Sequence, residues 1–127
     1  MIEWIEADAV LAAHEASLAR EGGAPGLRDA GLLASALERP INRHAYEDET
    51  DICILGATYA VGIAGNHPFV DGNKRTAFMT CAAFMLLNGR PLRAHQLDAA
   101  RVMLAVAAGE IDIEPLADWL RVHSREA

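Results

Sequence analysis

The residues best suited to chemistry lie in one short stretch, NHPFVDGNKRTAF, which runs from Asn66 to Phe78. It places a histidine, a carboxylate, an amide and two cations between two apolar segments. His67 belongs to a residue type that titrates near neutral pH and can act as a general base. Asp71 could bind Mg²⁺ together with phosphate oxygens, a common environment for that ion. The stretch therefore indicates a base and a metal ligand close together in the chain.

The second half of the stretch has the composition of a phosphate cradle. We expect a helix to begin here, and the start of a helix presents unpaired N–H groups and partial positive charge. Gly72 would let a ligand approach the backbone closely, and Asn73 can both donate and accept hydrogen bonds. Lys74 and Arg75 are cations at the helix end where cations are slightly unfavourable. An anionic partner such as polyphosphate would explain them.

Each of these residues also has an ordinary structural interpretation. A His-Pro pair is usually part of a loop, Asp-Gly-Asn is usually a turn and helix cap, and a Lys-Arg pair is usually solvated. Their coincidence at one helix start between two buried helices weakens that interpretation. A Walker A loop fits poorly, because Gly65 and Gly72 are too far apart and no strand precedes them. There is no HExxH zinc pattern and no nucleophile elbow around a serine.

The elements that must position these residues are helices. Alanine and leucine are abundant, and alternating valine-rich stretches are scarce, which predicts an all-α fold. The polar stretch joins two helices that are apolar on almost every side. One begins near Thr50 or Asp51 and runs to about Ala64, and the other spans Lys74–Leu87. The site should therefore lie at a joint between two central, mostly buried helices.

The remaining segments should surround this pair. We expect further helices over Asp8–Arg20, over Asp29–Leu37 with Asp29 as N-cap, over Gln96–Ala108, and from the first turn at Pro115 through Leu120. Gly22–Gly26 should form a loop. Glu38–Glu49 contains Pro40 and mixed charges and should be an irregular or extended connection. Gly56 and Gly62 lower the helix propensity of the central helix, so they should permit close packing.

The bulk properties limit the class of protein. The chain has 127 residues, 52% of them hydrophobic, which suits one domain over residues 1–127 with one core. A net charge of −7 argues against a general nucleic-acid binder. Cys53 and Cys81 lie in apolar runs without CxxC spacing, so core thiols are favoured over a disulfide or zinc site. The acidic start is unlike a signal peptide, and no apolar run is long enough to cross a bilayer. We therefore expect a cytoplasmic protein that binds neither a membrane nor nucleic acid directly.

The sequence HPFVDGNKRTA resembles the Fic motif, H-x-F-x-[DE]-G-N-x-R, and is similar to the Doc (death-on-curing) branch of the Fic/Doc family, the toxins of toxin–antitoxin pairs. GGAPGLRDAGLLASALERP, residues 22–40, looks like the amino-terminal segment of Doc proteins, and AAGEIDIEPLADWL is also similar in kind. The resemblance implies a compact helical bundle with a central motif helix. It also implies ATP and Mg²⁺ as cofactors and a cognate antitoxin as partner.

The resemblance assigns a role to each motif residue. His67 would be the general base that activates a target hydroxyl. Asp71 would hold Mg²⁺ on the nucleotide phosphates. Gly72 and Asn73 would help to form the anion pocket at the helix start, and Arg75 would neutralise phosphate charge.

Lys74 and Phe78 depart from the wider Fic pattern. Adenylylating Fic enzymes usually have glycine in place of Lys74 and a second arginine in place of Phe78. Doc proteins share the lysine, and the resemblance implies that they bind ATP in reversed orientation and phosphorylate a threonine of elongation factor Tu, which stops translation. We therefore predict an ATP-dependent protein serine/threonine kinase with Lys74 among its catalytic and nucleotide-binding residues. A Fic-like adenylyltransferase and a catalytically silent nucleotide- or antitoxin-binding module remain alternatives.

Two other features have weaker interpretations. Ser17, Glu21 and Gly22 fit [ST]-x-x-x-E-[GN], the inhibitory pattern whose glutamate blocks ATP in some Fic proteins. Such a short pattern arises easily by chance. We therefore expect Glu21 to be a surface residue at a helix end. Pro40–Thr50 would match, by analogy, the flap that aligns the target. The other histidines share no spacing with a catalytic partner and should be surface or satisfied residues: His14, His44, His95 and His123.

Overall fold

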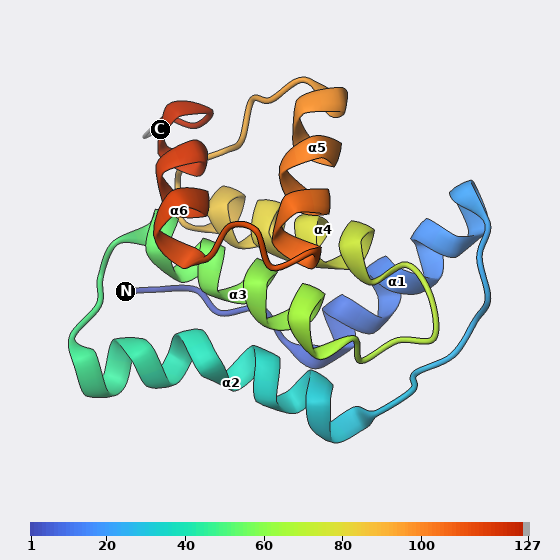
Figure 1. Ribbon diagram of the computed structural model, residues 1–127. Helices are drawn as coiled ribbons and strands as arrows, with labels where there is room; N and C mark the ends of the chain where they lie inside the picture. Colours follow the sequence, from blue (N-terminus) through green and yellow to red (C-terminus); the bar gives the residue numbers. More distant parts are fainter. Residues whose placement is uncertain (126–127) are drawn as a thin grey trace.

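The residues that the structure describes, 1–125, are built from α-helices joined by short connections. In this computed structural model the helices are α1 (Ala7–Glu21), α2 (Ala30–Glu47), α3 (Ile52–Asn66), α4 (Asn73–Leu87), α5 (Gln96–Ala107) and α6 (Ile113–Val122), as Figure 1 shows. Within these residues extended backbone forms two isolated bridges and no strand. The predicted all-α fold is confirmed.

The core is organised around α3, which packs against α2, α4, α5 and α6 (Figure 1). Every residue of α3 from 53 to 60 is buried. Leu55, Tyr59 and Ile63 are completely shielded from solvent, and Phe84 of α4 packs its ring against Tyr59. Burial of one large apolar side chain contributes about 1.5–3 kcal/mol, so this core fixes α3 and α4 firmly relative to each other.

The two glycines inside α3 bring its neighbours close. A Cβ at Gly56 would lie 3.1 Å from the sulfur of Met85 in α4. A Cβ at Gly62 would lie 3.4 Å from the Cα atom of Ala36 in α2. These contacts confirm that the glycines permit close helix packing, which offsets their lower helix propensity.

The expected irregular connection over Glu38–Glu49 is wrong, because α2 continues through it to Glu47. Pro40 lies inside the helix, where it removes one backbone hydrogen bond and would normally kink or end the helix. Here Pro40 is buried, and the helix packs against α3 one turn earlier through the contact of Ala36 with Gly62. Tertiary packing therefore holds the helix together across the proline. Asp29, in contrast, is the N-cap as predicted, accepting from the N–H of Leu32 at 3.0 Å.

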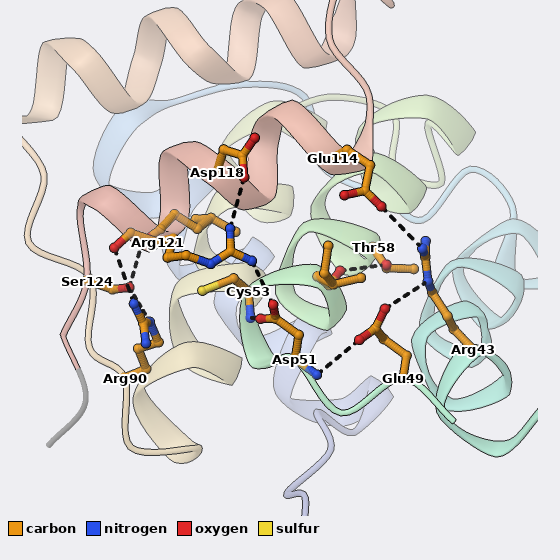
Figure 2. A network of polar contacts seen from close by, with 12 residues as sticks. Arg43, Glu49, Asp51, Cys53, Thr58, Arg90, Glu114, Asp118, Arg121 and Ser124 are labelled. Atoms are coloured by element: carbon orange, nitrogen blue, oxygen red, sulfur yellow. Dashed lines mark hydrogen bonds and ion pairs between the residues drawn. The ribbon is translucent and has the colours of Figure 1, made fainter. Parts of the chain in front are cut away.

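The amino-terminal end of α3 is tied to α6 by charged and polar residues (Figure 2). Asp51 caps α3 by accepting from the N–H of Cys53 at 2.8 Å. Arg121 of α6 donates to the other carboxylate oxygen of Asp51 at 2.6 Å. Arg90 donates to the hydroxyl of Ser124 at 2.7 Å beside this pair. The start of α3 is therefore closed by side chains of the protein itself.

Both cysteines are buried free thiols, as the sequence predicted. Burial raises the pKa of Cys53, and it raises that of Cys81 to about 12. Neither thiol is therefore suited to nucleophilic chemistry or metal binding near neutral pH. Among the helices described within 1–125, none is long and apolar enough to cross a membrane.

Candidate active site

His67 lies directly at the carboxyl end of α3. Its backbone adopts the left-handed conformation, with φ 50°, and its N–H donates to the carbonyl of Ile63 at 3.2 Å. Arg28 closes the same helix end, because its Nε donates to the His67 carbonyl at 2.8 Å and its Nη2 to the Asn66 carbonyl at 3.1 Å. A cation is favourable at the carboxyl end of a helix. The chain thus turns sharply at His67 and leaves its side chain exposed.

Asn73 organises the loop between α3 and α4 from inside. Its side chain is buried and bonds Phe69 twice: Oδ1 accepts from the Phe69 N–H at 2.9 Å, and Nδ2 donates to the Phe69 carbonyl at 2.9 Å. The same Nδ2 lies 3.3 Å from Nδ1 of His67. Phe69 itself is buried in the core. Asn73 therefore links the loop backbone to the position of the His67 ring.

The carboxylate of Asp71 is exposed and held by backbone N–H groups. Oδ2 accepts from the N–H of Ala24 at 3.1 Å, and Oδ1 accepts from the N–H of Gly72 at 2.8 Å. These two hydrogen bonds, followed by the charges of Arg75 and His14, lower the pKa of Asp71 below its ordinary value. The carboxylate is therefore ionised at neutral pH.

A glycine allows the loop after α1 to reach Asp71. Gly23 has φ 122°, and a Cβ at this position would lie 2.9 Å from Oδ2 of Asp71 and 3.0 Å from Leu18. A larger residue would therefore displace the loop from the carboxylate. The expected Gly22–Gly26 loop is confirmed, and it lies against the site.

His14 supports the site from α1. It is buried, its Nε2–H donates to the carbonyl of Asp71 at 2.7 Å, and its ring stacks on Phe69 with centroids 3.8 Å apart. The prediction of a satisfied histidine is confirmed, but its contact with the motif loop was not predicted. Its helical spacing with the apolar Leu11 and Leu18 was the available signal that it faces the interior.

The start of α4 is open. Gly72 occupies the N-cap position with φ 76°, and among residues 1–125 no side chain caps the helix. The first N–H groups of a helix have no partner within it, so they can bind an anion here. Lys74 in this first turn is exposed.

Arg75 is held by the carboxyl end of α1. Its Nε donates to the hydroxyl of Ser17 at 2.9 Å and lies 3.2 Å from a carboxylate oxygen of Glu21, and its Nη2 donates to the carbonyl of Gly22 at 3.0 Å. Glu21 is an exposed residue at a helix end, as expected. Yet all three residues of the possible inhibitory pattern contact the same guanidinium. The pattern remains a prediction, now with a defined contact to test.

The predicted site residues share one small cavity of about 190 Å³. It is lined by His67, Val70, Asp71, Gly72, Asn73, Lys74 and Arg75. Within residues 1–125 no group of three or more His, Cys, Asp and Glu side chains could hold a metal ion. A divalent ion at Asp71 would therefore take most of its ligands from a bound phosphate and from water.

The segment that lies against the motif loop is Gly26–Asp29. The N–H groups of Arg28 and Asp29 donate to the Pro68 carbonyl at 2.7 and 3.0 Å, and the N–H of Val70 donates to the Gly26 carbonyl at 3.0 Å. The analogy that placed a flap at Pro40–Thr50 is wrong, because most of those residues are in α2, whose carboxyl end points away from the α3–α4 joint (Figure 1).

Comparison with known proteins identifies the family. The model of the Fic/DOC family matches residues 4–85. The chain is 37% identical over 117 residues to "Protein kinase doc" of Escherichia phage P1, covering 92% of each chain. It is 32% identical over 120 residues to "Toxin Doc" of Mycolicibacterium smegmatis, covering 92% of this chain and 90% of the relative. The family model includes the whole motif loop, α3 and most of α4, and the alignments cover nearly the full length of two relatives, so the chain belongs to the Fic/Doc family.

Proposed function

We propose that this protein is a Doc-like toxin that transfers the γ-phosphate of ATP to a hydroxyl group of a target protein. The names of its relatives, "Protein kinase doc" and "Toxin Doc", support the activity and the biological role. The observation that carries the proposal is the single cavity at the uncapped start of α4, which a histidine, a carboxylate and two cations line together. This combination fits phosphoryl transfer, which depends mainly on positioning and charge stabilisation.

The phosphate groups would bind at the start of α4. Its unpaired N–H groups and partial positive charge attract anions, and Gly72 leaves the backbone accessible. Lys74 is exposed at the same place and would contact the phosphates as a point charge. Arg75 offers a guanidinium whose partial exposure leaves room for a phosphate oxygen beside its bonds to α1.

Asp71 fits a role as ligand of Mg²⁺. Its carboxylate is exposed, and each of its oxygens accepts one backbone hydrogen bond, which leaves further lone pairs for a cation. Bound there with ATP, Mg²⁺ would neutralise part of the charge on the phosphates. The hydrogen bonds from Ala24 and Gly72 would keep the carboxylate ionised and oriented.

His67 would take the proton from the target hydroxyl as its oxygen attacks the γ-phosphorus. A new P–O bond forms to the hydroxyl oxygen, the bond from the γ-phosphorus to the β,γ-bridging oxygen breaks, and ADP leaves with the electron pair. Asn73 would position the ring through its contact with Nδ1. Lys74 and Arg75 would stabilise the charge on the transferred group.

By family resemblance, the target is a threonine of elongation factor Tu, whose modification would inhibit translation. A cognate antitoxin would restrain the toxin. Purified elongation factor Tu incubated with the protein and ATP should gain one phosphate on a threonine by mass spectrometry. Addition of an antitoxin encoded beside the toxin should prevent it. An unmodified factor, with other lysate proteins labelled, would reject this target while leaving the kinase proposal intact.

Labelled ATP separates the proposed reaction from its alternatives. The protein is incubated with a bacterial lysate and with ATP labelled at either the α- or the γ-phosphate. Label on protein from the γ position alone is expected for the kinase. Label from the α position would instead support the adenylyltransferase, and ATP binding without transfer would support the silent binding module.

A histidine substitution tests the assigned base. His67→Ala should lower the rate of transfer by about 10²–10⁴-fold, the range for loss of a general base, without loss of helical structure by circular dichroism. His123→Ala is a matched control, because His123 is the C-cap residue that follows α6, stacks on Trp119 and does not line the cavity. Full activity of His67→Ala would refute the assignment.

A further inference from the structure

Arg28 lies beside the motif loop, just before Asp29, the N-cap of α2. Its Nε donates to the carbonyl of His67 at 2.8 Å, and its Nη2 donates to the carbonyl of Asn66 at 3.1 Å. Its backbone N–H donates to the carbonyl of Pro68 at 2.7 Å. One residue thus holds the carbonyl groups of three consecutive residues, and the proposed base is the middle one.

His67 has a backbone conformation that the following residue disfavours. Its φ of 50° and ψ of 55° lie in the left-handed region, which is uncommon for residues other than glycine. The next residue is Pro68, and a residue before proline is normally pushed toward extended backbone. The left-handed conformation of His67 therefore persists because the surrounding structure holds it there.

The bond from Arg28 acts on the angle that would change if His67 relaxed. Rotation about ψ turns the carbonyl group of His67, and this carbonyl accepts from Nε of Arg28. The other backbone contact of His67 is at its N–H, which donates to the carbonyl of Ile63 at 3.2 Å and leaves ψ free. Without the guanidinium, ψ could move toward extended values and carry the imidazole away from Asn73, whose Nδ2 lies 3.3 Å from Nδ1 of the ring.

A guanidinium suits this position in two ways. It is a cation at the carboxyl end of α3, where positive charge is favourable. Its planar fork also reaches two carbonyl groups at once, which a point charge cannot do with the same geometry. Arg28 is exposed, and within residues 1–125 its guanidinium bonds these two carbonyls and no carboxylate. Its contacts are therefore those of a clamp on the end of α3 and not of a surface ion pair.

We propose that Arg28 is a positioning residue, which holds His67 in the left-handed conformation and so keeps the imidazole in the cavity at the start of α4. The inference rests on the proposed role of His67 as general base and adds the residue that sets its geometry. Arg28 does not line the cavity, so it would act through His67 and not by contact with ATP. In a reaction that depends on alignment, a misplacement of about 1 Å can lower the rate by about 10²-fold.

Arg28→Met tests the clamp, because methionine keeps an apolar side chain but has neither the charge nor the donors. We expect kcat to fall by about 10–10²-fold, while KM for ATP and the requirement for Mg²⁺ stay within about twofold. Arg39→Met, at an exposed arginine of α2 outside the cavity, is the matched control. Rates are measured at a temperature where circular dichroism shows both variants folded. An unchanged kcat in Arg28→Met would overturn the proposal.

Arg28→Lys separates the fork from the charge. Lysine keeps a cation at the end of α3 but cannot bond both carbonyls in one plane. We expect most of the loss in kcat to remain. Full activity of Arg28→Lys would mean that the charge alone suffices, and it would overturn positioning by the two hydrogen bonds.

A double-mutant cycle tests whether Arg28 acts through His67. If it does, Arg28→Met should lower the residual rate of His67→Ala by less than about twofold, because the group that it positions is already gone. An equal loss in the wild-type and His67→Ala backgrounds would show that Arg28 affects the reaction by another route, and the proposal would fail.

NMR of the protein without ATP gives a readout that does not depend on activity. The ¹³Cα and ¹³Cβ chemical shifts of His67 report its backbone conformation. They should move toward extended values in Arg28→Met and stay unchanged in Arg39→Met, and unchanged shifts in Arg28→Met would overturn the proposal whatever the rates show. If the wild type transfers no phosphate, the proposed function fails, while this comparison still decides whether Arg28 holds the His67 backbone.

Discussion

The starts of α3 and α4 are built from similar residues but in opposite ways. Asp51 caps α3 with its own carboxylate, and Arg121 neutralises that carboxylate at 2.6 Å (Figure 2). Asp71 stands just before α4 without capping it, and the N-cap is Gly72. Arg75 turns to α1 instead of to Asp71. One helix start is closed by the protein, whereas the other keeps an exposed carboxylate and free N–H groups.

Under the proposed function, the same physical feature, the start of a helix, serves stability in α3 and binding in α4. A capped helix start stabilises the fold because its N–H groups and its charge are both satisfied. An uncapped start gives up part of that stabilisation and keeps the affinity for an anion. The buried α3 connects the two, so the site is held rigidly although its own polar groups remain open.

The largest expected effect comes from removing the carboxylate of the open start. Asp71→Ala should lower transfer activity by about 10²-fold or more, because loss of a metal ligand removes several kcal/mol of charge stabilisation. Folding should change little, since the carboxylate is exposed and bonds only two backbone N–H groups. Initial rates at saturating Mg²⁺ and urea unfolding would measure the two effects. Activity within twofold of the wild type would contradict the role given to Asp71.

The same substitution at the closed start should give the reverse result. Asp51→Ala removes the cap of α3 and one of the two carboxylates that Arg121 contacts, the other being that of Asp118. Loss of an N-cap lowers the free energy of unfolding by about 0.5–2 kcal/mol, and the exposed ion pair adds little. Urea unfolding should show this loss, while the transfer rate at a temperature where the variant is folded should remain near that of the wild type. A large loss of activity without loss of stability would contradict the purely structural role given to the start of α3.

The sequence was sufficient to predict the apolar central helices and the residues at the open start of α4. The apolar helical segments gave the approximate positions of α3 and α4, because this feature is local in the sequence. The motif gave His67, Asp71 and Arg75, and they line one cavity in the structure. The family resemblance supplied their roles, which the composition alone left open.

The sequence was insufficient where distant segments override local preference. Pro40 suggested a break, but packing of Ala36 on Gly62 continues α2 through it. The contact of His14 with Asp71 spans 57 positions, and that of Arg28 with His67 spans 39. Neither contact leaves a local pattern, since only the folded arrangement brings α1 and the following loop against the motif.

A smaller effect, on the affinity for ATP, is expected from the contact between Glu21 and Arg75 beside the open start of α4. Glu21 pairs with Arg75 at 3.2 Å, and both side chains are partly exposed. Such a pair contributes at most about 1 kcal/mol, so Glu21→Gln should raise the affinity for ATP by up to about fivefold by freeing the guanidinium. Glu15→Gln is a control on the same helix, at an exposed glutamate that does not line the cavity at the start of α4. Calorimetric titration with ATP would measure the difference, and weaker binding by Glu21→Gln would show that the pair supports the site instead of restraining it.

The smallest expected effect is the contribution of Asp51 to the stability of the fold at low pH. Burial raises the pKa of Asp51, but the hydrogen bonds from Arg121 and from the N–H of Cys53 outweigh it and leave the pKa below its ordinary value. A carboxyl with a lowered pKa stabilises the folded state at pH above its unfolded value and loses this contribution as the pH falls through the folded value.

Asp51→Asn would isolate this contribution, because asparagine caps a helix about as well as aspartate but carries no charge for Arg121. The stability gap between the wild type and Asp51→Asn should stay constant from about pH 7 to 5 and shrink below about pH 4. Urea midpoints across this range would measure it. A gap that persists below the folded pKa would mean that the carboxylate acts through its hydrogen-bond geometry and not its charge. The closed start would then resemble the open one, where Asp71 is held by backbone N–H groups.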